Sequence, residues 1–119
     1  MGYYSTRLPS LRVPGQTWTG CGAGRNTLGI QSDGGIKGCL SLPSDYVVGT
    51  VRDRSVVELW EGDAFEAWRR PVVRHGFCAE CPHGEVCEGG CTELAVTYSG
   101  RRGDNPMCFY RIEQRSAPL

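Results

Sequence analysis

Apolar and polar residues alternate over residues 27–39, which is the pattern of a β-hairpin. Leu28 and Ile30 occupy alternate positions, and the Asp-Gly-Gly sequence at 33–35 can form a turn with positive φ. Ile36 begins the returning strand. We therefore predict a hairpin that carries a cysteine at its exit.

Apolar residues at helical spacing predict short helices further along the chain. Ser55 and Glu58 have the spacing of a capping box, and the apolar residues that follow Ser55 would form one helical face. A second short helix is predicted over residues 64–70, with Asp63 as its candidate cap. The sequence TELAVTYS at 92–99 predicts a third.

Composition indicates a small core that needs additional support. The 119 residues include 17 glycines and seven prolines, and only 39% of the chain is apolar. A single small domain of this kind usually requires a disulfide or a metal for stability. We therefore predict a small, irregular, metal-stabilised α+β fold, with a β-hairpin followed by short helices and cysteine-rich loops.

Charge and hydropathy argue against several classes of partner. The 13 basic residues are balanced by 13 acidic ones, whereas nucleic acid and membrane surfaces attract a concentrated positive charge. The chain contains no apolar run long enough for a signal peptide or a membrane span. We therefore expect a cytoplasmic protein with no nucleic-acid or membrane partner, in which cysteines bind metal more often than they form disulfides.

The seven cysteines have spacings that suit two metal sites. Cys78 and Cys81 form a C-x2-C pair, the separation at which one tight loop directs two thiolates at one centre, as in zinc and iron-sulfur sites. Cys87 is close enough in sequence to be a third ligand, and Cys108 would be a fourth. The remaining cysteines would form a second site with three thiolates: Cys21, Cys39 and Cys91.

This order of cysteines resembles the seven-cysteine signature of the SPASM domain, the C-terminal extension of many radical S-adenosylmethionine (radical SAM) enzymes. The pattern is C-x12-G-x4-C, then C-x2-C-x5-C-x3-C and a distant last cysteine. The likeness extends from Cys21 to Cys108 and includes the sequences CEGGC, DNPMC and GTVRDRSVVELW. It implies three regions: an irregular lead-in at 1–20, a two-cluster domain at 21–110 and a C-terminal tail at 111–119.

The resemblance also implies two auxiliary iron-sulfur clusters, usually 4Fe-4S, with the cysteine-rich loops wrapped around them. The second cluster would be held by four residues: Cys78, Cys81, Cys87 and Cys108. The first would be held by three: Cys21, Cys39 and Cys91. Many family members take a fourth ligand from an upstream cysteine, but residues 1–20 contain none. An open iron, a ligand upstream of this sequence or a non-cysteine ligand would each account for the difference. We interpret His75, His83 and Asp104 as ordinary loop residues rather than ligands.

Radical SAM catalysis requires a C-x3-C-x2-C loop, which this sequence lacks. The resemblance therefore implies a domain that is not catalytic alone and works with a radical SAM core, in the same longer protein or in a separate chain. Such enzymes mostly modify ribosomally made peptides or proteins. We expect the clusters to relay electrons from the substrate, in preference to binding it directly. The alternatives are a structural zinc module for protein interaction and a disulfide-stapled secreted domain.

Overall fold

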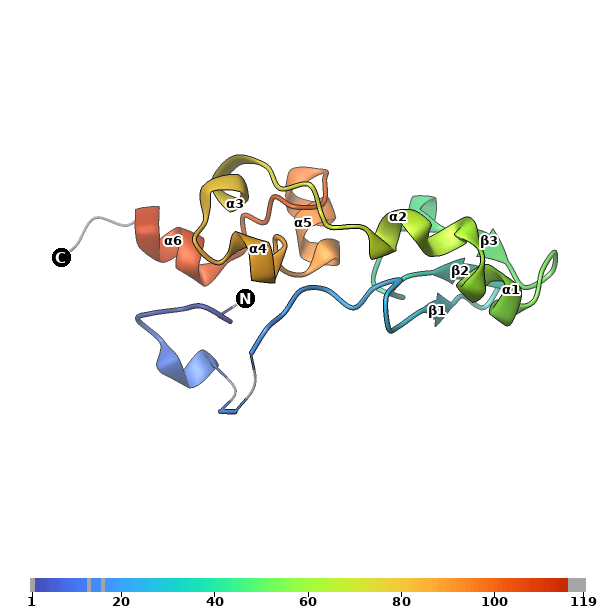
Figure 1. The fold of residues 1–119 in the computed structure, drawn as a ribbon, viewed down its shortest axis with the longest axis horizontal. Coiled ribbons are helices and arrows are strands. Elements are labelled where there is room, and N and C mark those ends of the chain that lie inside the picture. The colour runs from blue at the N-terminus through green and yellow to red at the C-terminus, as the bar shows by residue number, and fades with distance from the viewer. Residues whose placement is uncertain (1, 13, 16, 116–119) are drawn as a thin grey trace. The chain divides into compact units, whose positions relative to one another are not determined.

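The computed structural model describes residues 2–12, 14–15 and 17–115, and Figure 1 shows their helices and strands. The chain divides into two compact units, which we describe separately. Unit 1 combines Met1–Cys21 with Val72–Leu119, and unit 2 is Gly22–Pro71. These units are defined by how the chain packs, whereas the predicted regions 1–20, 21–110 and 111–119 were defined by the expected cluster binding. The boundaries of the predicted regions stay a prediction.

Unit 2 contains a three-stranded antiparallel sheet in the order β1-β2-β3. The strands are β1 (Gly29–Ile30), β2 (Gly35–Lys37) and β3 (Gly49–Thr50). Ile30 pairs with Ile36, and Gly34 in the connecting turn has a φ of +93°. The predicted hairpin is therefore confirmed. Strand β3 was not predicted, because two residues cannot show an alternating pattern.

The predicted helices of unit 2 are present. Helix α1 (Val56–Glu61) is capped by Ser55, whose Oγ accepts a hydrogen bond of 3.1 Å from the Glu58 N–H. A 3₁₀ helix (Asp63–Phe65) leads into α2 (Glu66–Arg69), which ends before Pro71. Asp63 is not a cap as expected. It is the first residue of the 3₁₀ helix, and no side-chain hydrogen bond caps that helix.

These elements enclose the larger apolar core of the chain. Ile36 from the sheet, Leu59 from α1 and Phe65 from the 3₁₀ helix are almost completely buried. Strand β3 approaches this core closely at Gly49, where an added Cβ would lie 2.6 Å from Leu59 Cδ2. The sheet and helices of unit 2 therefore pack together directly, with side chains from each.

Lys37 is the buried charged residue of this unit, and its side chain supports the loop that contains Cys39. Only 4% of the residue is exposed. Its Nζ donates hydrogen bonds to the carbonyl oxygens of Leu40, at 3.0 Å, and Leu42, at 2.5 Å. The Leu42 N–H donates in turn to the Cys39 carbonyl at 3.1 Å. The ammonium group thus fixes the backbone turn that follows this predicted ligand.

We expect Lys37→Met to lower the free energy of unfolding by roughly 1–3 kcal/mol, because it leaves the buried Leu42 carbonyl and the partly buried Leu40 carbonyl without their donor. The control is Arg52→Met, since Arg52 Nε donates to the Asp33 carbonyl at 3.0 Å in an exposed position. The control should change stability by less than about 0.5 kcal/mol. Urea denaturation followed by tryptophan fluorescence compares the two variants. Equal losses would show that the Lys37 contacts do not stabilise the loop.

Unit 1 consists of short helices joined by loops. The α-helices are α3 (Gly76–Glu80), α4 (Gly84–Cys87), α5 (Thr92–Ser99) and α6 (Phe109–Arg115). Helix α5 has the predicted bounds and ends at Gly100, whose left-handed φ of +83° lets its N–H bond to the Val96 carbonyl. In the lead-in, a 3₁₀ helix forms at Pro9–Leu11.

Together the two units confirm a small α+β fold with a three-stranded antiparallel sheet and several short helices. Wrapping of the loops around two clusters stays a prediction. Within the described residues, the structure contains no helix whose length and apolar character would let it cross a membrane.

Candidate metal centre

Four cysteines line one pocket within unit 1. The pocket is partly open to solvent. Its lining includes Cys78, Cys81, Cys87 and Cys108. These are the four residues that the sequence predicts as ligands of one cluster. The structure therefore brings this set together, although Cys108 lies 21 residues beyond Cys87 in the sequence.

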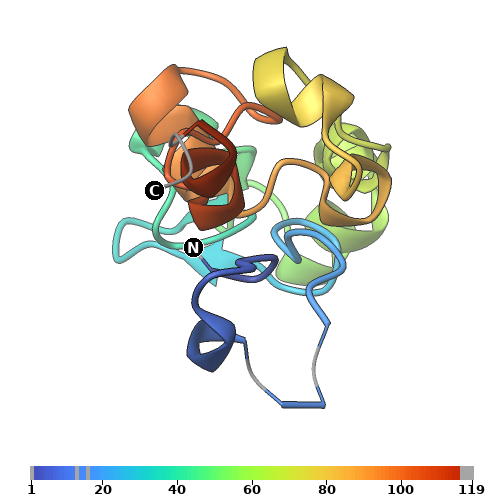
Figure 2. The ribbon, with the colours of Figure 1, turned by 90° about the vertical axis from the view of Figure 1, so that its left-hand side faces the viewer.

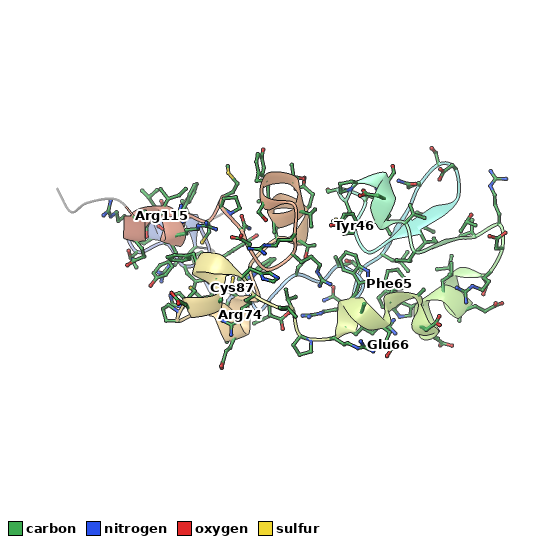
Figure 3. The ribbon with its side chains drawn as sticks, turned by 90° about the horizontal axis from the view of Figure 1, so that it is seen from above. Tyr46, Phe65, Glu66, Arg74, Cys87 and Arg115 are labelled. Carbon is green, nitrogen blue, oxygen red and sulfur yellow. The ribbon has the colours of Figure 1, made fainter. Side chains whose placement is uncertain are left out.

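Short helices and tight turns direct these cysteines. Cys78 lies on α3, Cys81 follows the end of that helix, and Cys87 is the last residue of α4. The two helices are joined by a turn in which the Gly84 N–H donates to the Cys81 carbonyl at 2.9 Å. Arg74 Nη1 donates to the Cys78 carbonyl at 3.1 Å, and Figure 3 labels Arg74 and Cys87 in this part of unit 1.

The chain after Cys87 reverses through three consecutive residues with positive φ. Glu88 has a φ of +55°, Gly89 of +85° and Gly90 of +74°. Gly89 also lies so close to the neighbouring loop that an added Cβ would be 2.6 Å from the Gly103 Cα. Glycine is favoured here both by conformation and by space, which explains the CEGGC sequence in physical terms.

Burial raises the pKa of the thiols in the pocket, whereas backbone hydrogen-bond donors lower it. Burial, followed by the charge of the neighbouring Cys108, raises the pKa of Cys87 to about 11, and a hydrogen bond from the Gly90 backbone opposes the increase. Burial also raises the pKa of Cys78, which a hydrogen bond from the Asn105 backbone opposes. Several thiolates in one partly buried pocket repel one another unless a cation is present. The donor set therefore fits a positively charged metal group bound by thiolates.

An ion pair supports the loop that leads to Cys108. Arg111 Nη1 on α6 lies 2.8 Å from Asp104 Oδ1, and both side chains are largely buried. The Arg111 hydrogen bond is the main reason that the pKa of Asp104 is lowered. The Arg111 guanidinium also lies 5.8 Å from the centre of the Phe77 ring on α3. Asp104 thus holds the loop against α6.

The second predicted set of cysteines is divided between the units. Cys21 and Cys91 belong to unit 1, whereas Cys39 follows β2 in unit 2. Burial and then the charges of Cys91 and Cys21 raise the pKa of Tyr3, so its phenol lies near both thiols. The joint role of the three cysteines as ligands stays a prediction from the sequence.

The aromatic residues near the N-terminus were expected to pack on the domain or on a missing neighbour, and the sequence did not place them at the cysteines. Tyr3 and Tyr4 also line the four-cysteine pocket, together with Phe77, His83 and Tyr110. Tyr4 stacks on His83 with ring centres 4.2 Å apart. No local pattern could have predicted this pairing, because the two residues are 79 positions apart.

Across 2–12, 14–15 and 17–115, no three histidine, cysteine or acidic side chains converge closely enough to hold a single metal ion. In the same part of the chain, six cysteines form no disulfide: Cys39, Cys78, Cys81, Cys87, Cys91 and Cys108.

Comparison with known proteins defines the class of this chain. The SPASM family, described as an iron-sulfur cluster-binding domain, matches residues 21–82, which is just over half of the chain. The chain belongs to the SPASM family. Pre-heme d1 synthase of Dinoroseobacter shibae is a similar protein, 28% identical over 109 residues. The match covers 88% of this chain but only 27% of that enzyme, and no solved structure matches significantly.

The family match confirms the resemblance and identifies iron-sulfur cluster binding as the property of this class of domain. The matched segment contains four of the predicted ligands: Cys21, Cys39, Cys78 and Cys81. Cys87, Cys91 and Cys108 lie beyond it. The number and type of clusters, and the ligands of each, stay predictions.

Proposed function

We propose that this chain is an auxiliary iron-sulfur cluster domain that works with a radical SAM catalytic core and relays electrons from the substrate. The observation that carries the proposal is the pocket in which Cys78, Cys81, Cys87 and Cys108 come together in a chain of the SPASM family. The chain spans about a quarter of its relative's length, so a separate core or a longer protein would supply the radical chemistry.

The four cysteines of the pocket would hold one cluster, which supplies one-electron transfer when bound. The chain itself would set the conditions for that transfer. The Gly90 and Asn105 backbones donate hydrogen bonds to the thiols of Cys87 and Cys78, and such donors stabilise the more negative, reduced state. The aromatic side chains that line the pocket would keep water away from the cluster. Because water stabilises the reduced state, its exclusion would oppose the effect of these hydrogen bonds.

The two sets of cysteines favour different roles. A set of four thiolates completes the coordination of a 4Fe-4S cluster and leaves no iron for substrate, which favours electron relay at the pocket. The set of Cys21, Cys39 and Cys91 has three thiolates. If substrate binds iron directly in this domain, we propose that it does so at the second set.

The substrate of the longer protein has two candidates. The family resemblance favours a peptide or protein, modified after its synthesis. The name of the relative, pre-heme d1 synthase, favours instead a precursor of heme d1, and that match extends over 88% of this chain. Binding of a ribosomal precursor peptide and of a porphyrin-type compound to the complete enzyme would separate the two candidates.

Anaerobic purification followed by iron and sulfide quantification and Mössbauer spectroscopy tests the proposed cofactor. We expect a brown protein with broad absorption near about 400 nm, from charge transfer between thiolate and iron. A colourless protein that contains zinc and no acid-labile sulfide would contradict the proposal. That result would favour the alternative, a structural zinc module for protein interaction.

A further inference from the structure

We propose that residues 3–7 form a strap that closes the four-cysteine pocket, and that Glu113 is the positioning residue that holds the strap in place. The strap has the sequence Tyr-Tyr-Ser-Thr-Arg. Its aromatic half faces the pocket and its polar half binds helix α6. The proposal rests on the proposed function only in taking the pocket to be a metal site.

The polar half of the strap is bound to α6 by one carboxylate. Glu113 accepts hydrogen bonds from the Thr6 N–H at 2.9 Å, the Thr6 hydroxyl at 3.0 Å and the Arg7 N–H at 3.2 Å. The Ser5 hydroxyl donates to the same carboxylate, and Ser5 is completely buried. In Figures 1 and 2 the N-terminal segment, in blue, runs beside the red helix α6.

Backbone N–H groups and hydroxyls of the strap bind the Glu113 carboxylate as an anion. The hydrogen bond from Ser5, followed by that from the Thr6 backbone, lowers the pKa of Glu113 to about 2, so the carboxylate is ionised at neutral pH. An ionised carboxylate accepts stronger hydrogen bonds than a neutral amide does. A glutamine at this position would therefore bind the strap more weakly, although it has nearly the same shape.

The aromatic half of the strap lies against the pocket. Tyr4 stacks on His83, at an interplanar angle of 12°, and His83 meets the edge of Tyr110, with ring centres 4.8 Å apart. Tyr3 stacks on Trp18, with ring centres 4.3 Å apart. Both tyrosines belong to the pocket lining. Five aromatic rings thus line the pocket with the thiols, the first two of them from the strap: Tyr3, Tyr4, Phe77, His83 and Tyr110.

Two further hydrogen bonds connect the strap with the cysteine loop. The Tyr4 hydroxyl donates to the Trp18 carbonyl at 2.6 Å, and the Trp18 Nε1–H donates to the Cys87 carbonyl at 3.2 Å. A shift of the strap would therefore move the aromatic rings away from Cys87. The hydrogen bonds of Glu113 go to the strap and not to the thiols, so Glu113 would act on the pocket through Tyr4.

Closure by the strap has a predictable effect on the bound group. Water stabilises the more negatively charged, reduced state of an iron-sulfur cluster, so admitting water raises its reduction potential. Opening also gives chelators and oxygen access to the metal. Release of the strap should thus shift the potential to more positive values and accelerate metal loss.

The experiment compares Glu113→Ala and Glu113→Gln with Gln114→Ala, an exposed position on the same helix, in the metal-loaded protein. The rate at which a chelator removes metal should rise by roughly threefold or more in Glu113→Ala, less in Glu113→Gln, and not in the control. Redox titration of the iron-loaded forms should give the same order of effects. The reduction potential should become more positive in Glu113→Ala, less so in Glu113→Gln, and should not change in the control. Unchanged rates and potentials would overturn the proposal.

Tyr4→Ala provides a second route to the same test. It should accelerate metal release by itself, and adding Glu113→Ala to it should have little further effect, because the two residues act in series. Full additivity of the two changes would overturn the proposal. The two proposals fail in different ways. If the anaerobically purified protein contains zinc without acid-labile sulfide and its zinc release responds to Glu113, the strap is supported and the cluster is contradicted. A stable cluster that does not respond to Glu113 excludes the strap alone.

Discussion

Cys81→Ala is expected to lose about half of the iron and acid-labile sulfide of the protein, and to keep the remainder as one intact cluster. Cys81 lines the pocket with three other cysteines, and a 4Fe-4S cluster that loses one of four thiolates is held less firmly and exposed to solvent. Iron and sulfide quantification under anaerobic conditions measures the loss. Mössbauer spectra show whether the remaining iron belongs to a single type of cluster.

Cys39→Ala tests the second predicted set of ligands: Cys21, Cys39 and Cys91. It should also lose about half of the iron. The cluster that it keeps should be the one that Cys81→Ala loses, so the Mössbauer spectra of the two variants should differ. Val86→Ala is the control, because Val86 is exposed and precedes Cys87 on α4. It should retain the iron content of the unmodified protein. Loss of both clusters in equal measure from each cysteine variant would contradict the division of ligands into sets of four and three.

Removal of the metal is expected to unfold unit 1 well before unit 2. Among the residues of unit 1 that the structure describes, the buried apolar ones are Cys78, Ala95 and Val96. Those of unit 2 are larger and more numerous: Ala23, Ile36, Leu42, Leu59, Phe65 and Trp68. Burial of apolar area is the main favourable term in folding, so unit 1 depends more on its metal. In small zinc domains, binding of the metal contributes on the order of 10 kcal/mol.

Hydrogen exchange before and after anaerobic chelation measures this difference. Amides of α3 to α6 should lose most of their protection, whereas β2 and α1 should keep a measurable part of theirs. The sequence alone predicts that the hairpin unfolds together with the Cys78 to Cys108 region. The separate core around Phe65 is the reason to expect a difference between the units. Circular dichroism and exchange that do not change after chelation would contradict the metal dependence of the fold.

Local sequence signals predicted the hairpin and the helices α1, α2 and α5, but not α3, α4 or α6. The turn at 33–35, the capping pair Ser55 and Glu58, and the helix at 92–99 all appear in the structure. Each depends on residues within a few positions of one another, so a single sequence contains the necessary information. Strand β3 was missed for the opposite reason. Its two residues become a strand only by pairing with β2.

The sequence by itself determined the class of the protein, because the spacing of the cysteines reflects the geometry of metal binding within short loops. Only the tertiary structure decided what surrounds the thiols. The Ser5 contact with Glu113 spans 108 positions, and Trp18 reaches Cys87 across 69. Such contacts depend on how the chain folds back on itself, and neither hydrophobic periodicity nor residue spacing records that path.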